Sequence, residues 1–148
     1  VYVYAVETSI QMTLTELNEN LREIYLEAYT HQEAMEYIYE HTSAELYHIF
    51  SPYLPGYTES DFYELEIGTA GIMRGYMARE CDKYFTLEKK LSRFLAMTMS
   101  AFKVPEEEQE KVIGFIAGLD IRGISEQVMR ELFRALAMQF EFSLNGLE

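Results

Sequence analysis

The sequence has no tryptophan, a single cysteine, three prolines and eight glycines among its 148 residues. Because Cys81 is alone, no disulfide can form within the chain, and we expect a reducing, cytoplasmic environment. So few prolines and glycines exclude collagen-like and low-complexity chains. The longest apolar runs, near 94–99 and 132–142, are interrupted by polar or charged residues, which excludes a bilayer span. The composition predicts one globular domain over residues 1–148.

Basic residues are scarce in the first half of the chain. Residues 1–73 hold thirteen acids and one base, Arg22, whereas residues 74–148 hold twelve acids and eleven bases. The net charge of the chain is −13. Proteins bind DNA mainly through Lys and Arg side chains that neutralise phosphates. We therefore expect that this chain does not contact DNA by itself.

A helical period of apolar residues runs through the chain and predicts an all-α fold of about six helices. The expected helices span about 2–29, 31–50, 59–84, 87–103, 105–119 and 125–145. Thr30 and Glu33 form the pattern of a capping box ahead of the second helix. The third helix contains Gly68, Gly71 and Gly75, so we expect it to be tightly packed or bent at these positions.

The second helix carries the residues best suited to bind a metal ion. His41, Glu45 and His48 are spaced so that they share one helix face. Glu45 and His48 also form the Glu-x-x-His unit of di-iron carboxylate bundles, but the chain has no second such unit. The three residues are either metal ligands, as in a helical di-metal carboxylate enzyme, or a polar flank or pocket wall. We favour the second interpretation and expect no metal and no cofactor.

Tyrosine is abundant, with twelve residues, and most of them crowd the first three expected helices together with several methionines. Tyrosines give apolar walls with polar tips and methionines adapt to varied shapes, which suits a ligand cavity between helices. The alternative is a close-packed core. Aromatic rings near carboxylates favour a lipophilic or cationic organic ligand, with Glu45 and Glu64 as the expected charge partners. The expected ligand-binding residues are Tyr25, Tyr29, Ile38, Thr42, Glu45, Glu64, Met73, Tyr76 and Phe94.

Apolar residues cover well over half of the circumference of the last helix, which is more than packing against one core requires. We expect the last two helices to meet their copies across a two-fold axis in a four-helix interface of a homodimer. The alternative is a central helix buried within one chain. The expected interface residues are Val112, Phe115, Ile116, Leu119, Val128, Leu132, Phe133, Leu136 and Phe140.

Three segments together resemble a known family. They are the amphipathic start Val1-Tyr2-Val3-Tyr4-Ala5-Val6-Glu7, the helix start Pro105-Glu106-Glu107-Glu108, and the closing helix that includes residues 123–137. In layout the chain resembles the C-terminal regulatory domain of TetR-family transcriptional repressors. The resemblance covers essentially the whole chain.

The resemblance implies a function without catalysis. A small organic effector would bind among the first four helices and release DNA from a helix-turn-helix domain that precedes Val1. The expected helix at the start of the chain has no capping signal, which agrees with this expectation. A purely structural dimerisation module and the di-metal enzyme based on Glu45 and His48 are the alternatives.

Overall fold

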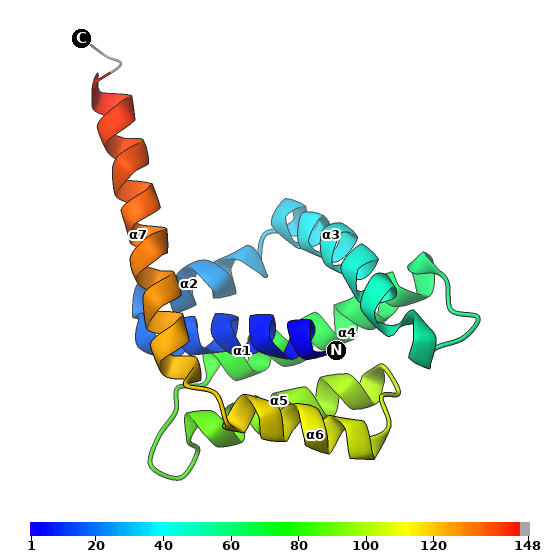
Figure 1. Ribbon diagram of the computed structural model, residues 1–148. Coiled ribbons are helices and arrows are strands. Elements are labelled where there is room, and N and C mark those ends of the chain that lie inside the picture. The colour runs from blue at the N-terminus through cyan, green and yellow to red at the C-terminus, as the bar shows by residue number, and fades with distance from the viewer. Residues whose placement is uncertain (146–148) are drawn as a thin grey trace.

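The computed structural model describes the backbone of residues 1–145 and the side chains of residues 1–137. This part of the chain is all-helical and has no strand, which confirms the expected all-α class (Figure 1). Its elements are α1 (Tyr2–Leu17), α2 (Glu19–Ala28), α3 (Gln32–Phe50), the short 3-10 helix η1 (Ser51–Tyr53), α4 (Glu59–Ala78), α5 (Leu87–Ala101), α6 (Glu106–Ala117) and α7 (Ile121–Asn145).

The single helix expected over residues 2–29 is wrong, because the chain breaks at Asn18. The backbone of Asn18 is extended, with φ −146° and ψ 117°. Its side-chain oxygen accepts a hydrogen bond from the backbone N–H of Leu21 at 3.0 Å and so caps α2. A cap of this kind satisfies one of the free N–H groups at a helix start, which stabilises the break. The described part of the chain therefore has seven α-helices rather than six.

Side-chain caps start α4 and α5, whereas the cap expected ahead of α3 does not form. Thr58 and Asp61 make a complete capping box at the start of α4, and the Thr86 hydroxyl accepts from the backbone N–H of Lys89 at the start of α5. Ahead of α3, the Thr30 hydroxyl instead donates to the carbonyl of Glu27 at 2.7 Å. The predicted capping box at Thr30 is therefore wrong, since this hydroxyl is used by the preceding helix.

Two helix boundaries also differ from the expectation. α4 ends at Ala78, where the backbone of Arg79 becomes extended, and in the turn that follows the Asp82 carboxylate accepts hydrogen bonds from the backbone N–H groups of Tyr84 and Phe85. α7 begins at Ile121, with the Asp120 carboxylate accepting from the backbone N–H of Gly123 at 3.0 Å. The Asp120 bond is an N-cap that starts α7 earlier than expected. The Asp82 bonds instead hold a turn where a regular helix was expected.

The glycines of α4 do not mark tight packing, which was one of the two expectations for them. Gly68, Gly71 and Gly75 are exposed, and a Cβ atom added at any of them would meet no atom within 4 Å. They therefore lie on the open face of α4, and close packing of another helix does not explain them.

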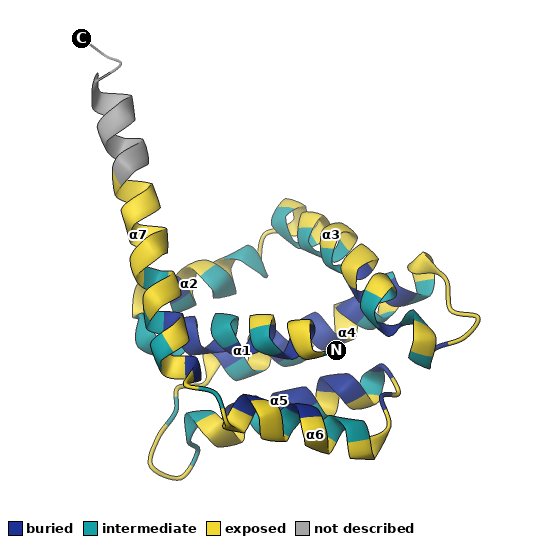
Figure 2. Ribbon diagram, viewed as in Figure 1, coloured by how far each residue is buried: buried dark blue, intermediate teal, exposed yellow. Residues whose placement is uncertain are grey.

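α1 lies in the middle of the molecule, where it contacts α2, α4, α5, α6 and α7 (Figure 1). The core beside it is built on aromatic rings. Phe50 of α3 and Phe102 after α5 stack at 4.2 Å between ring centroids, and Tyr4 of α1 packs edge-on against Phe50 at 5.1 Å. Phe62 of α4 is also fully buried. Figure 2 shows that the buried residues gather where these helices face one another.

The other end of α1 is held by charged groups. The fully buried Lys90 of α5 donates to the Glu16 carboxylate at 2.9 Å and also to the carbonyl of Arg79. The second oxygen of Glu16 accepts from the backbone N–H of Cys81 at 2.6 Å. Burial opposes ionisation of Glu16, but the hydrogen bonds from Cys81 and Lys90 together hold its pKa below the ordinary value. This cluster fixes the loop between α4 and α5 against α1.

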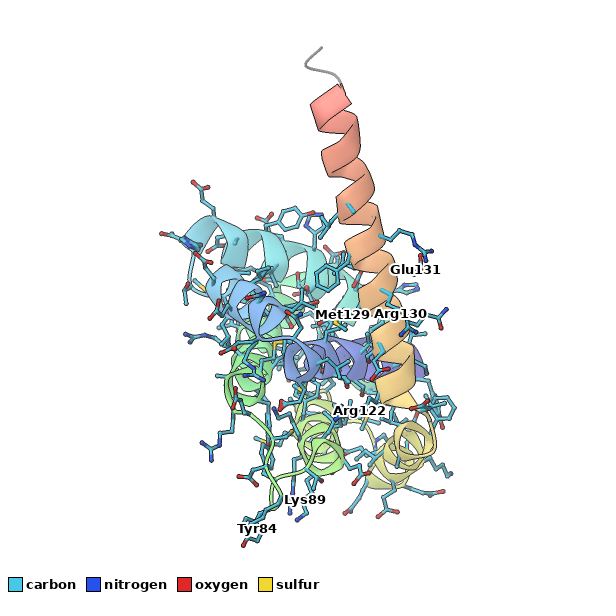
Figure 3. All side chains as sticks on the ribbon, turned by 90° about the vertical axis from the view of Figure 1, so that its left-hand side faces the viewer. Tyr84, Lys89, Arg122, Met129, Arg130 and Glu131 are labelled. Atoms are coloured by element: carbon cyan, nitrogen blue, oxygen red, sulfur yellow. The ribbon has the colours of Figure 1, made fainter. Side chains whose placement is uncertain are left out.

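α7 begins against the other helices and then extends away from them (Figure 1). Ile121 and Ser125 are buried, whereas residues 131–137 are all exposed. In Figure 3, Met129, Arg130 and Glu131 lie on α7 at the start of this exposed stretch, and Tyr84 lies at the bottom of the view, away from the C-terminal end of α7.

No helix in the described part of the chain is both long and apolar enough to cross a membrane.

Candidate functional site

A cavity of about 110 Å³ lies among α1, α3, α4 and α5, beside the residue that follows α2. It is small compared with typical ligand pockets of about 300 Å³ or more. Its walls are apolar, aromatic, hydroxyl-bearing and acidic. The lining residues are Tyr4, Glu7, Thr8, Gln11, Tyr29, Thr42, Glu45, Leu46, Ile49, Glu66, Thr69, Ala70, Met73 and Phe94.

Three helices present the same spacing to this cavity. α1 contributes Tyr4, Glu7, Thr8 and Gln11, α3 contributes Thr42, Glu45, Leu46 and Ile49, and α4 contributes Glu66, Thr69, Ala70 and Met73. Each set follows the pattern i, i+3, i+4, i+7, which places its members on one face of a helix. The cavity is therefore formed by regular helix faces and contains no irregular loop segment apart from Tyr29.

Glu66 is the buried charged group of this site. Glu66 is 5% exposed, and its carboxylate accepts one hydrogen bond, from the Thr69 hydroxyl at 3.0 Å. Burial raises the pKa of Glu66 to about 7, and the hydrogen bond from Thr69 only partly opposes this rise. The group is therefore poised to gain or lose a proton near neutral pH.

Aromatic rings form much of the remaining wall. Phe94 of α5 is 1% exposed, and Tyr4 of α1 is also buried. Burial, followed by the negative charge of Glu66, raises the pKa of Tyr29 to about 12, and burial likewise raises the pKa of Tyr4. Both phenols therefore stay neutral in the physiological range, and the Tyr29 hydroxyl lies 4.0 Å from the sulfur of Met73.

The structure brings together five of the nine residues expected to bind a ligand, namely Tyr29, Thr42, Glu45, Met73 and Phe94. The other four do not line this cavity. Tyr25 packs at the edge of the core, Ile38 is half-buried elsewhere on α3, and Tyr76 lines a separate hollow beside Gly71 and Phe85. Glu64 is exposed, because it lies on a different face of α4 from Met73.

The buried acid was missed by sequence reasoning, although a signal for it was present. Met73 was expected on the wall, and counting back seven residues along the same helix face leads to Glu66. The face of α1 that carries Tyr4 and Glu7 was missed as well. It could not be oriented from the sequence, because α1 is apolar or buried on several sides.

The residues considered as metal ligands are not gathered into a site. His41, Glu45 and His48 are all exposed on α3, and Tyr37 stacks on the ring of His41 at 4.1 Å. Within the described residues, no group of three or more His, Cys, Asp or Glu side chains is placed to hold a metal ion. Glu45 instead lines the cavity, in agreement with the interpretation of these residues as part of a pocket wall.

The residues expected at a dimer interface divide into two groups. Val112 and Ile116 are buried within this chain, so they are not free to contact a second copy, and Leu119 is half-buried beside the same core. The inclusion of Val112 and Ile116 in a surface interface is wrong, because α6 turns these two residues toward α1 and α5, whereas that of Leu119 stays a prediction. The exposed members are Phe115, Val128, Leu132, Phe133 and Leu136, and Phe140 lies outside the residues whose side chains are described.

A comparison with known protein families found no family model that matches this chain, and searches of curated proteins and of solved structures found no significant match.

Proposed function

We propose that this chain is the effector-binding and dimerisation domain of a TetR-like transcriptional regulator. A small organic ligand occupies the cavity and weakens DNA binding by a separate helix-turn-helix domain of the same protein. The proposal needs no catalytic group, metal or cofactor. It also places the protein in the cytoplasm, in line with its single cysteine.

The observation that carries this proposal is the cavity against α1. Four residues of α1 line it, and α1 also contacts α2, α4, α5, α6 and α7. A ligand that binds one position of α1 better than another shifts the population toward that position. A coupling of about 1 to 3 kcal/mol is typical of such regulation. α1 is therefore suited to carry the effect of a ligand to other parts of the protein.

The exposed apolar residues of α7 support the dimer. Leu132 and Leu136 lie seven residues after Ser125 and Met129, so they continue the helix face that begins buried against the body. Both are about two-fifths exposed, as are Val128 and Phe133. In proteins, most of the stability of a helix comes from packing of its apolar face against a neighbour. The exposed end of α7 therefore needs a partner for this face. We propose a second copy of this chain as that partner.

The acidic charge of the chain favours an indirect role in DNA binding. A net charge of −13 disfavours contact with the phosphates of DNA, which are neutralised mainly by Lys and Arg side chains. In the proposed protein, contact with DNA is therefore made by the helix-turn-helix domain alone.

A ligand screen with a cavity-filling variant tests the proposal. Thr42 lines the cavity from α3, whereas Ala44 is exposed on the same helix and lies outside it. A compound that occupies the cavity should raise the melting temperature of the unaltered chain and of Ala44→Trp, but not of Thr42→Trp. At a hundredfold excess over its dissociation constant, a ligand adds about 2.7 kcal/mol to the free energy of unfolding.

The same compound should release the full-length protein from its operator DNA, measured by fluorescence anisotropy. A compound that stabilises Thr42→Trp as much as the unaltered chain would place the ligand elsewhere. Binding in the cavity without any effect on DNA affinity would refute the regulatory role.

A further inference from the structure

Glu66 differs from Glu16, the other acid whose side chain is largely covered by the fold. Glu16 is paired with Lys90 at 2.9 Å and with Arg22 at 3.8 Å. Glu66 is 5% exposed, yet within the described residues it forms no ion pair, and its one hydrogen-bond donor is Thr69 of its own helix. A buried carboxylate is costly to ionise unless an opposite charge accompanies it. The fold therefore supplies a counter-ion for Glu16 but none for Glu66.

The surroundings of Glu66 also lack positive charge. The cavity lining, as far as the structure describes the chain, includes the carboxylates of Glu7, Glu45 and Glu66 and no Lys, Arg or His. Glu7 and Glu45 are exposed and lie at the rim, while Glu66 is buried. A lining with three carboxyl groups and no basic group favours a cation over an anion, most strongly when Glu66 is ionised.

The remaining walls suit an organic cation better than a bare metal ion. The rings of Tyr4, Tyr29 and Phe94 line the same space, and aromatic faces attract alkylammonium groups. The acids are not clustered as metal ligands, since no group of three or more possible metal ligands occurs among the described residues.

We infer that the cavity binds the ammonium end of a small organic amine, with Glu66 as its buried counter-ion and the aromatic rings of Tyr4, Tyr29 and Phe94 around its apolar part. This inference deepens the proposed function, on which it rests, by naming the chemical class of the effector. It also corrects the sequence-based choice of Glu64, which is exposed on another face of α4.

The size of the cavity limits what enters it. A cavity of about 150 Å³ holds a benzene molecule, and this one measures about 110 Å³. A head group of a few heavy atoms fits, such as a small branched alkylammonium. Any longer part of the ligand extends out of the cavity.

The matched pair tert-butylammonium and tert-butanol tests this inference, because the two have the same shape and differ in charge. Binding to the purified chain is measured by calorimetry for the unaltered protein, Glu66→Gln and the control Glu64→Gln. We expect the unaltered protein and Glu64→Gln to bind the cation at least about tenfold more tightly than the alcohol. Glu66→Gln should lose this preference, with circular dichroism and thermal melting verifying that it is folded.

A second measurement uses only the unaltered protein. Tetramethylammonium keeps its charge at every pH, so its affinity should rise as the pH is raised through about 7 and Glu66 ionises. The titratable groups that face Glu66 are Tyr4, Tyr29, Glu7 and Glu45. The phenols stay protonated in this range, and the variant Glu7→Gln/Glu45→Gln should keep the same pH dependence if Glu66 is its source.

Three results would overturn the inference. They are equal affinity for the cation and the alcohol, an unchanged preference in a folded Glu66→Gln, and no binding of either cation. If the alcohol binds as well as the cation and Thr42→Trp abolishes both, the cavity remains a ligand site and only the choice of a cation fails. If neither probe binds, the inference fails, and the broader ligand screen decides the proposed function separately.

Discussion

Lys90 Nζ lies 2.9 Å from Glu16 Oε2, with the lysine side chain fully buried and the glutamate 9% exposed. The pair joins the start of α5 to the C-terminal end of α1. The opposite end of α1 lines the cavity with Tyr4, Glu7 and Thr8. α1 is therefore anchored by charge at one end and open to a ligand at the other.

Lys90→Met should destabilise the fold strongly. The change removes the nearer of the two cations paired with Glu16, the other being Arg22 at 3.8 Å, and breaking a fully buried pair costs about 3 to 5 kcal/mol, so we expect a loss of up to this size. Urea unfolding measures the loss. The double variant Glu16→Gln/Lys90→Met should be more stable than Lys90→Met, because it also removes the Glu16 charge that has lost its nearer partner.

Lys111→Met is the control for this prediction. It breaks the ion pair with Glu107, whose two side chains are 64% and 81% exposed, and should cost less than about 0.5 kcal/mol. Equal losses for Lys90→Met and Lys111→Met would contradict the anchoring role of Lys90.

Asn18→Ala should weaken the junction between α1 and α2. The variant loses the side-chain hydrogen bond to the backbone N–H of Leu21, and loss of such a cap costs about 1 kcal/mol. Asn20→Ala, an exposed site in the first turn of α2, should cost nothing or stabilise slightly. Thermal unfolding of the two variants compares them, and an unaffected Asn18→Ala would show that the break in the helix has another cause.

Glu66 should make the stability of the unliganded protein fall as the pH rises. Its pKa is about 7 in the folded chain against an ordinary value of 4.5, so between these values the folded state keeps a proton that the unfolded state has released. The stability contributed by the neutral acid is complete below pH 4.5 and is lost as the pH passes 7. The loss amounts to about 3 kcal/mol.

Urea unfolding of the unaltered chain and of Glu66→Gln over this pH range isolates the contribution of Glu66 from that of the other acids. The two stability curves should diverge as the pH rises from 4.5 to 7, with Glu66→Gln falling less. Parallel curves would mean that the pKa of Glu66 is not raised.

Leu136→Glu should dissociate the proposed homodimer without unfolding the chain. Leu136 is 43% exposed on α7, so a charge there is tolerated in the single chain but would be buried between two copies. Light scattering measures the mass in solution. Gln127→Glu adds the same charge on the opposite side of α7 and should leave the dimer intact. A monomeric unaltered protein at micromolar concentration would refute the dimer.

The local patterns predicted most of the helices correctly but not their breaks. The Thr58 and Thr86 caps could be found from the sequence because the bonds that they make lie within one turn of the chain. The break at Asn18 escaped notice because the apolar period continues across it, and Asn is only one of several residue types that cap helices. The exposed glycines of α4 show the same limit, since a sequence does not say which helix face is covered.

The sequence by itself determined that this protein is all-helical, acidic and rich in tyrosine, because helix period and composition depend on neighbouring residues and on simple counts. The ligand-binding residues expected from the sequence also included five that line the cavity, namely Tyr29, Thr42, Glu45, Met73 and Phe94. Only the tertiary structure decided that Glu66 is the buried acid of that set and Glu64 the exposed one. The two residues are chemically identical, and the rotation of α4 against α1 and α3 decides which of them leaves water.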